Sequence, residues 1–294
     1  MPTTRERYTA LEQPCRNFNI LATAVVVDPA DGREKFVLSN FVAGGTGNLI
    51  LIDTLTGEGE SIPLPGDCGA WGLVNYRNEK LIVGTCPNHA YLHCLDLKTR
   101  TWAEPLRDEN EKYFWNMCIG SDGCVYGGTW PGCSLLRYDP ERHVLENVGR
   151  VSDNPKNLYS RPVNGDLPGY ILVAGGYDEP FLKAWSMETR TFFDFGTPGA
   201  VVREVTPEFI CTEKDGQLEF FDPKTFERLD DAGLESKLSH RHSTLPNGQR
   251  IPVKPLANGR FAGVRGQDYF VIDGLEEVPV LKRIPVPAPP TGIH

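Results

Sequence analysis

The sequence lacks any long hydrophobic run, and this absence limits the classes of protein that it can encode. Although 40% of its 294 residues are hydrophobic, no apolar stretch reaches the roughly 18 residues that a membrane-spanning helix needs. The N-terminal stretch MPTTRERYTALEQ has no apolar core of a secretory signal. We therefore expect a cytoplasmic protein with no membrane partner, or a secreted one if a signal has been removed.

Positive charge is also scarce. The chain has 30 Lys and Arg residues against 39 Asp and Glu residues, which gives a formal net charge of −9. A protein that neutralises the phosphates of a nucleic acid needs the opposite balance. We therefore expect no nucleic-acid partner, although a few arginines can still form a local basic pocket.

Cysteine is present, but in no pattern that binds metal. No C-x-x-C pair occurs and no Cys/His group has the spacing of a zinc site, so we expect neither a metal nor a cofactor. Most of the cysteines lie in or beside short apolar segments, and we expect them to be reduced, buried thiols. The cysteines are Cys15, Cys68, Cys86, Cys94, Cys118, Cys124, Cys133 and Cys211.

In place of long runs, the chain has short apolar segments joined by turn residues. The clearest series lies between Phe114 and Gly149. Its apolar segments are Phe114–Ile119, Cys124–Gly128, Ser134–Tyr138 and Val144–Val148. Glycine, proline and aspartate fill the joints, so the segments are predicted to pair as four strands of one antiparallel sheet.

This four-stranded unit recurs along the chain. Trp71 is followed by the pair Gly84–Thr85. Trp115 is followed by the pair Gly128–Thr129 at the same spacing. A four-stranded unit that recurs every roughly 40–50 residues is typical of a β-propeller blade. We therefore predict an all-β protein, a β-propeller of four-stranded antiparallel blades with no helix longer than about two turns.

Six repeats can be delimited within a single propeller domain that spans residues 18–294. They cover about residues 18–65, 68–107, 112–150, 156–196, 200–230 and 240–285. The first strand of the sixth repeat is expected near His240, with an insertion, Pro246–Pro255, before its second strand. Residues 1–17 are expected to form a tail. Residues 286–294 are either the start of an incomplete seventh blade or a strap.

A D/S-x-x-T pattern marks the turn after the third strand of most repeats. Asp and Ser side chains accept hydrogen bonds from nearby backbone amides, so these residues are predicted to build turns and not to act as acids or metal ligands. The pattern occurs at Asp53–Thr56, Asp96–Thr99, Ser186–Thr189 and Asp222–Thr225, with Asp139 in a variant copy and Asp273 in a degenerate last copy.

Two stretches carry a resemblance to a known repeat. They are Leu81–Trp102, with the turn Asp96-Leu-Lys-Thr-Arg-Thr-Trp102, and Ile171–Phe192, with Gly175-Gly176 and the turn Ser186-Met-Glu-Thr-Arg-Thr-Phe192. Both resemble kelch repeats, whose second strand ends in Gly-Gly before a Tyr-Asp-x-x-Thr-x-x-Trp turn. The resemblance extends over about four repeats and implies the propeller fold without a particular activity. The WD dipeptide of WD40 blades and the Glu-Gly-Pro opening of lactonase-like propellers are absent.

A propeller brings distant residues together, because the first strands of its blades begin at the same mouth of the central channel. The loops between second and third strands open onto the same face, and clefts of this kind bind ligands. The substrate-binding candidates expected there are Trp71, Trp115, Asn116, Trp130, Tyr177, Asp178, Arg241 and Arg265. The catalytic candidates are His89, Tyr159, Arg161, Arg203 and His242.

These residue types favour a carbohydrate-active propeller. Flat aromatic rings beside Asn and Asp suit a sugar, and arginines suit a carboxylate. A polysaccharide lyase that cleaves next to a uronic acid by β-elimination needs a cation at the carboxylate, a base for the C5 proton and an acid for the leaving oxygen. The partner is then an acidic oligosaccharide or polysaccharide.

Two other hypotheses stay open. The first is a non-catalytic kelch-like propeller that binds a protein or a glycan on one face. The second is a metal-assisted hydrolase or lactonase that uses His89, His242 and Glu204. Structural roles are open as well, because Trp115 and its counterpart in the second repeat can pack between blades, and Arg203 can form a salt bridge with Glu204.

Overall fold

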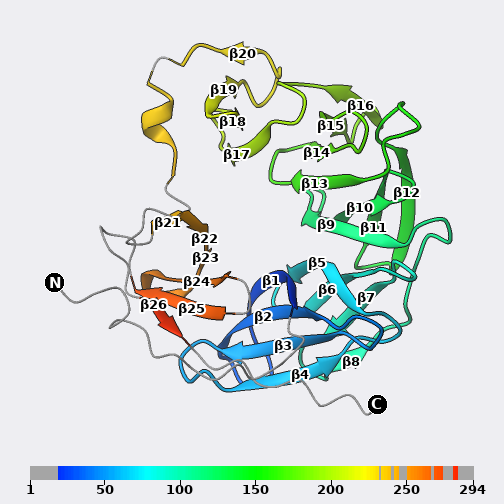
Figure 1. Cartoon of the computed structure of the whole chain (residues 1–294), viewed down its shortest axis with the longest axis vertical. Helices are drawn as coiled ribbons and strands as arrows, with labels where there is room; N and C mark the ends of the chain where they lie inside the picture. The colour runs from blue at the N-terminus through cyan, green and yellow to red at the C-terminus, as the bar shows by residue number, and fades with distance from the viewer. Residues whose placement is uncertain are drawn as a thin grey trace. The chain divides into compact units, whose positions relative to one another are not determined.

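The protein is built almost entirely of β-strands (Figure 1). The computed structural model describes residues 19–231, 233–239, 242–244, 250–265, 268–273 and 281–283. Within these ranges the helices are two short 3-10 turns, η2 (Glu235–Lys237) and η3 (Ala257–Gly259). No helix in the described part of the chain is long and apolar enough to cross a membrane. The prediction of an all-β fold is confirmed.

Six four-stranded antiparallel sheets form the blades of a β-propeller, and consecutive strands pair within each of them. Blade 1 contains β1 (Asn19–Val27), β2 (Glu34–Phe41), β3 (Asn48–Asp53) and β4 (Gly59–Pro63). Blade 2 contains β5 (Gly69–Tyr76), β6 (Lys80–Cys86), β7 (Leu92–Asp96) and β8 (Thr101–Trp102). Blade 3 contains β9 (Tyr113–Ile119), β10 (Val125–Trp130), β11 (Ser134–Asp139) and β12 (Val144–Arg150).

The remaining blades follow the same order. Blade 4 contains β13 (Ser160–Asn164), β14 (Tyr170–Gly175), β15 (Phe181–Ser186) and β16 (Thr191–Asp194). Blade 5 contains β17 (Val201–Val205), β18 (Ile210–Lys214), β19 (Gln217–Phe221) and β20 (Arg228–Leu229). Blade 6 contains β23 (Lys254–Pro255), β24 (Arg260–Arg265), β25 (Asp268–Asp273) and β26 (Leu281–Arg283).

The start of the sixth blade differs from the prediction. The segment expected to be its first strand forms a separate two-stranded hairpin, β21 (His242–Thr244) with β22 (Arg250–Pro252). The first strand of the four-stranded sheet is β23, which pairs with β24. The sequence between β21 and β22 includes Pro246-Asn247-Gly248, and Asn-Gly is a strong hairpin signal. The prediction that His242 begins an inner strand of blade 6 is therefore wrong.

The chain divides into two compact units. The first consists of residues 1–81, 94–103 and 240–294, and the second of residues 82–93 and 104–239. Within the first unit, blade 6 packs directly against blade 1. The apolar cluster that joins these two blades contains Phe36, Leu38, Ile50, Ile52, Leu256, Ala262 and Val271. Among the described residues no further sheet lies between them, and the segments predicted as a tail (1–17) and as a seventh-blade start (286–294) are outside these residues.

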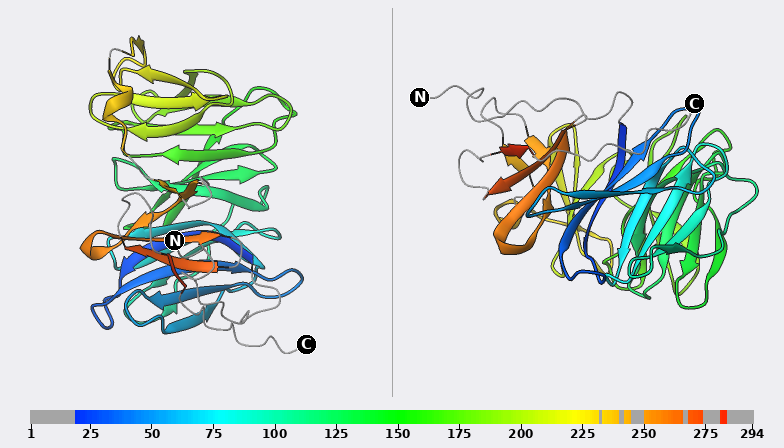
Figure 2. Two further views of the ribbon diagram at one scale, coloured as in Figure 1. Left: turned by 60° about the vertical axis from the view of Figure 1, so that its left-hand side comes forward. Right: turned by 90° about the horizontal axis from the view of Figure 1, so that it is seen from below.

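Within the second unit, successive blades share apolar clusters that are buried between their sheets. The cluster between blades 3 and 4 includes Tyr126, Leu135, Ile171, Val173 and Trp185. The cluster between blades 4 and 5 includes Leu172, Leu182, Ala184, Ile210 and Phe221. These three blades, coloured green to yellow, follow one another as stacked sheets in Figure 2. Blade 4 is thus covered by a neighbouring blade on each face, as short strands of alternating side chains require.

The Gly-Thr pair that recurs at the end of the second strand has two roles in blade 3. Thr129 Oγ1 accepts the amide of Ser134 at 3.0 Å and closes the loop between β10 and β11. Thr85 Oγ1 makes the corresponding bond in blade 2 at 2.9 Å. A Cβ on Gly128 would lie 2.1 Å from the Ser160 carbonyl oxygen, so glycine lets blade 4 approach.

The predicted turn residues act as predicted. Asp96 Oδ1 accepts the amides of Lys98 and Thr99 at 2.9 and 2.8 Å. These bonds, the one from Thr99 above all, lower the pKa of Asp96. Asp53, Asp139 and Asp222 each accept the corresponding two amides, and Ser186 Oγ accepts one, from Thr189.

The residue after each of these turns has a left-handed backbone, and its side chain reaches the preceding blade. In blades 2 to 5 these residues are Arg100 (φ 59°), His143 (φ 52°), Arg190 (φ 55°) and Phe226 (φ 60°). Arg190 pairs with Glu146 of β12, and Phe226 meets Phe193 of β16 edge-on at 4.9 Å. This position of the repeat therefore forms a contact between successive blades, which we term a staple. The staple is an ion pair at Arg190 and an aromatic contact at Phe226.

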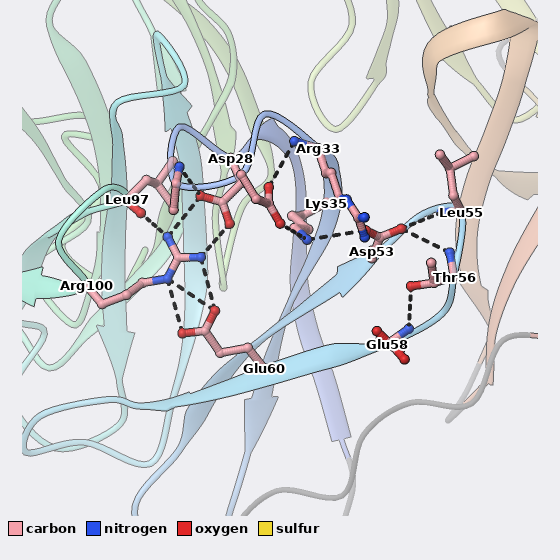
Figure 3. Close-up of polar contacts among 12 residues, drawn as sticks. Asp28, Arg33, Lys35, Asp53, Leu55, Thr56, Glu58, Glu60, Leu97 and Arg100 are labelled. Atoms are coloured by element: carbon pink, nitrogen blue, oxygen red, sulfur yellow. Dashed lines mark hydrogen bonds and ion pairs between the residues drawn. The ribbon is translucent and has the colours of Figure 1, made fainter.

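Arg100 makes an extensive staple in the first unit (Figure 3). Its guanidinium binds the Asp28 carboxylate with both terminal nitrogens, one at 3.1 Å, and Glu60 of β4 at 3.0 Å. The Asp28 side chain is only 1% exposed. Burial would lower the pKa of Arg100, but its hydrogen bonds to Glu60 and Asp28 more than offset this and raise it.

Four cysteines of the second unit agree with the predicted thiol state. They are Cys118, Cys124, Cys133 and Cys211, all free thiols, and the last three are buried. Burial raises the pKa of Cys124, Cys133 and Cys211 to about 11. These thiols therefore keep their protons and pack as small hydrophobic side chains. Cys15 lies outside the described residues.

Candidate functional site

Aromatic side chains gather where the first strand of blade 3 begins, in the second unit. Tyr113 and Trp115 lie on β9, and Trp130 ends β10 directly opposite Tyr113. Alternate residues of a strand share a face, and the rings of Tyr113 and Trp115 stack at 5.4 Å between centroids. Trp130 meets Tyr113 edge-on at 5.2 Å. All three residues are half-buried.

Arg161 joins this group from the first strand of blade 4. Its guanidinium carbon lies 4.8 Å from the ring centre of Trp115 and 5.1 Å from that of Tyr159. The two rings are 5.9 Å apart and tilted by 56°. Their negative faces attract the cation and fix its position. Arg161 is exposed, and no carboxylate of the described residues forms an ion pair with it.

The buried acid Glu111 holds the loop that follows Trp130. Glu111 is only 3% exposed, and its Oε2 accepts the Gly132 amide at 2.9 Å. A Cβ on Gly132 would lie 2.0 Å from Glu111 Oε1, so a larger residue there would displace the Glu111 carboxylate. Cys133 Sγ donates to the Tyr159 carbonyl at 3.3 Å, as a thiol whose pKa burial raises can do. These contacts hold the loop of blade 3 beside Tyr159.

The corresponding loop of blade 4 is fixed by a buried amide. Asn157 is 2% exposed, and its Oδ1 accepts the successive amides of Tyr177, Asp178 and Glu179 at 3.0, 3.1 and 3.0 Å. The Gly176 amide donates to the Tyr159 carbonyl at 3.1 Å. This frame presents Tyr177, which is 75% exposed. A large apolar ring is thus held in solvent by a backbone with little freedom to move.

Two of the predicted substrate-binding residues support the protein's own structure. Asn116 Nδ2 donates to the Pro162 carbonyl at 3.0 Å and links β9 to β13. Asp178 accepts a hydrogen bond from Asn154 at 3.1 Å and lies 3.9 Å from the Lys156 ammonium. Both residues are exposed, so these contacts leave them within reach of a ligand.

Arg203 forms a salt bridge, but with a different acid from the one expected. Its Nε lies 2.6 Å from Glu213 on the neighbouring strand β18. Glu204 instead accepts the Ser239 amide at 2.7 Å. Successive residues of a strand point to opposite faces, so a cross-strand neighbour is the better partner. The expectation that Arg203 pairs with Glu204 is wrong.

His89 lies in a second aromatic cluster, in the loop between β6 and β7. Its ring stacks on Tyr91 at 5.0 Å and an interplanar angle of 25°. The Arg107 guanidinium lies 5.6 Å from the centre of the Tyr91 ring, and Tyr91 is 5.4 Å from His93. His89 is therefore placed by ring contacts in the second unit.

The remaining predicted site residues lie in the first unit or outside the described residues. Trp71 is half-buried on β5 in the first unit. For His242, on β21, and Arg265, at the end of β24, the structure describes only the backbone. Arg241 lies outside the described residues. In the part of the chain that the structure describes, no three His, Cys, Asp or Glu side chains are close enough to hold a metal ion.

The described structure therefore brings part of the predicted site into one group, which we term the aromatic rim. Ring contacts link Tyr113, Trp115, Trp130, Tyr159 and Arg161. The rim also includes Tyr177, whose loop adjoins Tyr159 through the Gly176 amide. Aromatic ring faces and guanidinium donors are groups that can bind other molecules. Tyr113 and the supporting residues Glu111, Cys133 and Asn157 were not among the predicted site residues.

Comparisons with known proteins show a similarity in fold alone. No protein-family model matches the sequence, and no curated protein matches it. The chain is similar to the structure of U3-55K, at 12% identity and a TM-score of 0.55 over 92% of this chain and 82% of that one. It has the same identity, TM-score and coverage with the RRP9 WD40 repeats. It is also similar to the extracellular domain of BT4673 from B. thetaiotaomicron, at 13% identity and a TM-score of 0.50 over 92% of this chain and 39% of that one. These neighbours support a β-propeller and not specifically the kelch type.

Proposed function

We propose that the protein is a non-catalytic β-propeller that binds a protein partner through the aromatic rim. The observation that carries this proposal is Tyr177, 75% exposed on a loop whose amides are held by the buried Asn157. A large side chain on a rigid loop loses little conformational freedom on binding. Tyr, Trp and Arg are also the residue types that dominate binding energy at protein interfaces.

A uronate lyase is the weaker candidate. That reaction needs a cation at the substrate carboxylate and a base aligned with the C5 proton. Arg203 is engaged by Glu213 at 2.6 Å, which leaves Arg161 as the arginine of the candidate pair that has no carboxylate among the described residues. Arg161 is surrounded by aromatic rings, which suits a recognition surface. The kelch-like turns are compatible with a binding role, because the resemblance implies no particular enzymatic activity.

The proposal can be tested without a known partner. A random peptide display library is selected on the immobilised protein, and the dissociation constants of the recovered peptides are measured for the unmodified protein and for Tyr177→Ala. Truncation of a tyrosine at an interface centre typically costs about 2 kcal/mol, so we expect binding to weaken about thirtyfold.

The matched control is Leu55→Ala, because Leu55 is a comparably exposed apolar residue at 73% but lies in a turn of the first unit. We expect it to leave the dissociation constant unchanged. Failure to recover any peptide, or equal losses from both variants, would reject the aromatic rim as the binding surface.

A further inference from the structure

The aromatic rim contains one cation whose situation points to the chemistry of the partner. We propose that Arg161 is the receptor for a carboxylate, so that the partner is an acidic peptide segment with Asp or Glu beside an apolar side chain. This inference rests on the proposed function and names the class of peptide that the same surface takes. The amino-acid sequence alone placed Arg161 opposite a sugar acid, whereas its surroundings favour a peptide.

Arg161 differs from most arginines of the described structure. Many other arginines form ion pairs with carboxylates of this chain. They are Arg33, Arg100, Arg107, Arg137, Arg190, Arg203 and Arg228. Arg161 instead lies over Trp115 and Tyr159, and no carboxylate of the described residues pairs with it. Acidic residues outnumber basic ones in this chain. A guanidinium kept apart from them on an exposed surface is available to an external acid.

The ring contacts also prepare Arg161 for such a ligand. A guanidinium that stacks on aromatic faces keeps its in-plane N–H groups for hydrogen bonds, and two of them match the two oxygens of a carboxylate. The stacking holds a long side chain that would otherwise lose rotamer freedom on binding. The half-buried Trp130 ends β10 of blade 3, and the exposed Tyr177 lies in the loop between β14 and β15 of blade 4. They offer apolar contact to the residue next to the acid.

A carboxylate fits this surface better than a phosphate. Phosphate groups on peptides are bound by clusters of arginines. Arg161 is the only arginine of the aromatic rim as defined by the described residues. The nearby loop carries Asp178, whose carboxylate repels a doubly charged phosphate more strongly than a singly charged carboxylate. A singly charged side chain with a flat, bidentate head is therefore the better match.

The test uses N-acetylated, C-amidated hexapeptides in which one central position is Asp or Glu, or the isosteric Asn or Gln. They include the peptides recovered by display selection and an array in which the neighbouring position is varied. We expect each acidic peptide to bind at least about tenfold more tightly than its amide counterpart, the size of one charge-assisted hydrogen bond. In Arg161→Gln this preference should disappear, while weaker binding through Tyr177 persists. Arg161→Lys should retain only part of the preference, because lysine lacks the planar fork.

Arg142→Gln is the matched control for charge. Arg142 is an exposed arginine of blade 3, in the turn between β11 and β12, and its removal changes the net charge equally. We expect it to preserve the acid preference, and melting temperatures should show that every variant is folded. Loss of the preference in both variants would mean a general charge effect and would overturn the proposal.

The failures of the two proposals are distinguishable. Peptides that bind through Tyr177 without an acid preference would overturn the role of Arg161 and leave the binding function intact. If no peptide binds but oligogalacturonate does so in an Arg161-dependent manner, both the peptide class and the protein-binding function are wrong.

Discussion

Arg100→Ala tests whether the staples between blades contribute to stability. Arg100 is 23% exposed and binds Asp28, which is 1% exposed, and Glu60, which is 46% exposed. Removing one partner of a buried ion pair costs about 3–5 kcal/mol, because the other charge stays buried. Asp28 keeps the Ala30 amide at 3.0 Å, and the exposed Glu60 contact is worth at most about 1 kcal/mol. We therefore expect a loss near the lower limit, about 3 kcal/mol.

The assay is urea unfolding at pH 7, followed by tryptophan fluorescence, with the loss read from the midpoint at constant slope. Glu60→Gln should stay within about 1 kcal/mol of the unmodified protein. Combining Asp28→Asn with Arg100→Ala should cost less than the sum of the single changes, since no charge is then left buried. A midpoint for Arg100→Ala equal to that of the unmodified protein would refute the view of the staple as a stabilising contact.

Three further predictions follow from individual contacts. Gly132→Ala places a Cβ 2.0 Å from Glu111 Oε1. The change should displace the loop that follows Trp130, lower stability by about 1–3 kcal/mol and weaken peptide binding. Unchanged peptide binding would contradict the role of Glu111 in holding this loop. Burial of Asp53 would raise its pKa. Hydrogen bonds from the Thr56 and Leu55 amides and from Arg33 and Lys35 more than offset this and lower the pKa below its usual range. The stability that Asp53 contributes is therefore present above the unfolded pKa of about 3.9 and is lost as pH falls through the folded pKa. The stability difference between the unmodified protein and Asp53→Asn should accordingly shrink below about pH 4, and a difference that is constant with pH would be inconsistent with this. Burial raises the pKa of Cys124, Cys133 and Cys211 to about 11, so iodoacetamide at pH 8 should label them slowly in the native protein and rapidly in urea; equal rates would exclude their burial.

The parts of the fold that the sequence predicted are those set by local interactions. The segment predicted as a strand at Ser134–Tyr138 is β11, because its apolar residues lie between strong turn signals. Asp96 and its counterparts bind amides of the same turn, and such short-range contacts are visible in the linear chain. The hairpin of β21 and β22 also has a local sequence signal, Asn247-Gly248, but this pair lies in the segment Pro246–Pro255 that was predicted to be an insertion.

The parts that the sequence did not predict depend on long-range contacts. Glu111 binds Gly132, and Asn157 binds the amide of Tyr177, from positions ahead of the first strand of each blade. In the sequence each is one polar residue in a loop among many others. A signal does exist, because both residues precede a blade by a similar interval, but only the pairing of the strands shows that the loops meet. The Arg203 partner was missed for the same reason, since Glu213 is a neighbour across the sheet.

The most direct test of the aromatic rim is hydrogen exchange of the protein with and without a peptide recovered by selection. The account predicts new protection in residues 130–133, 157–161 and 176–180, which contain the loops held by Glu111 and Asn157. Residues 120–124, the turn at the other end of β9 and β10, should exchange at an unchanged rate. Protection of that turn, with none in the three rim segments, would contradict the assignment of the binding surface.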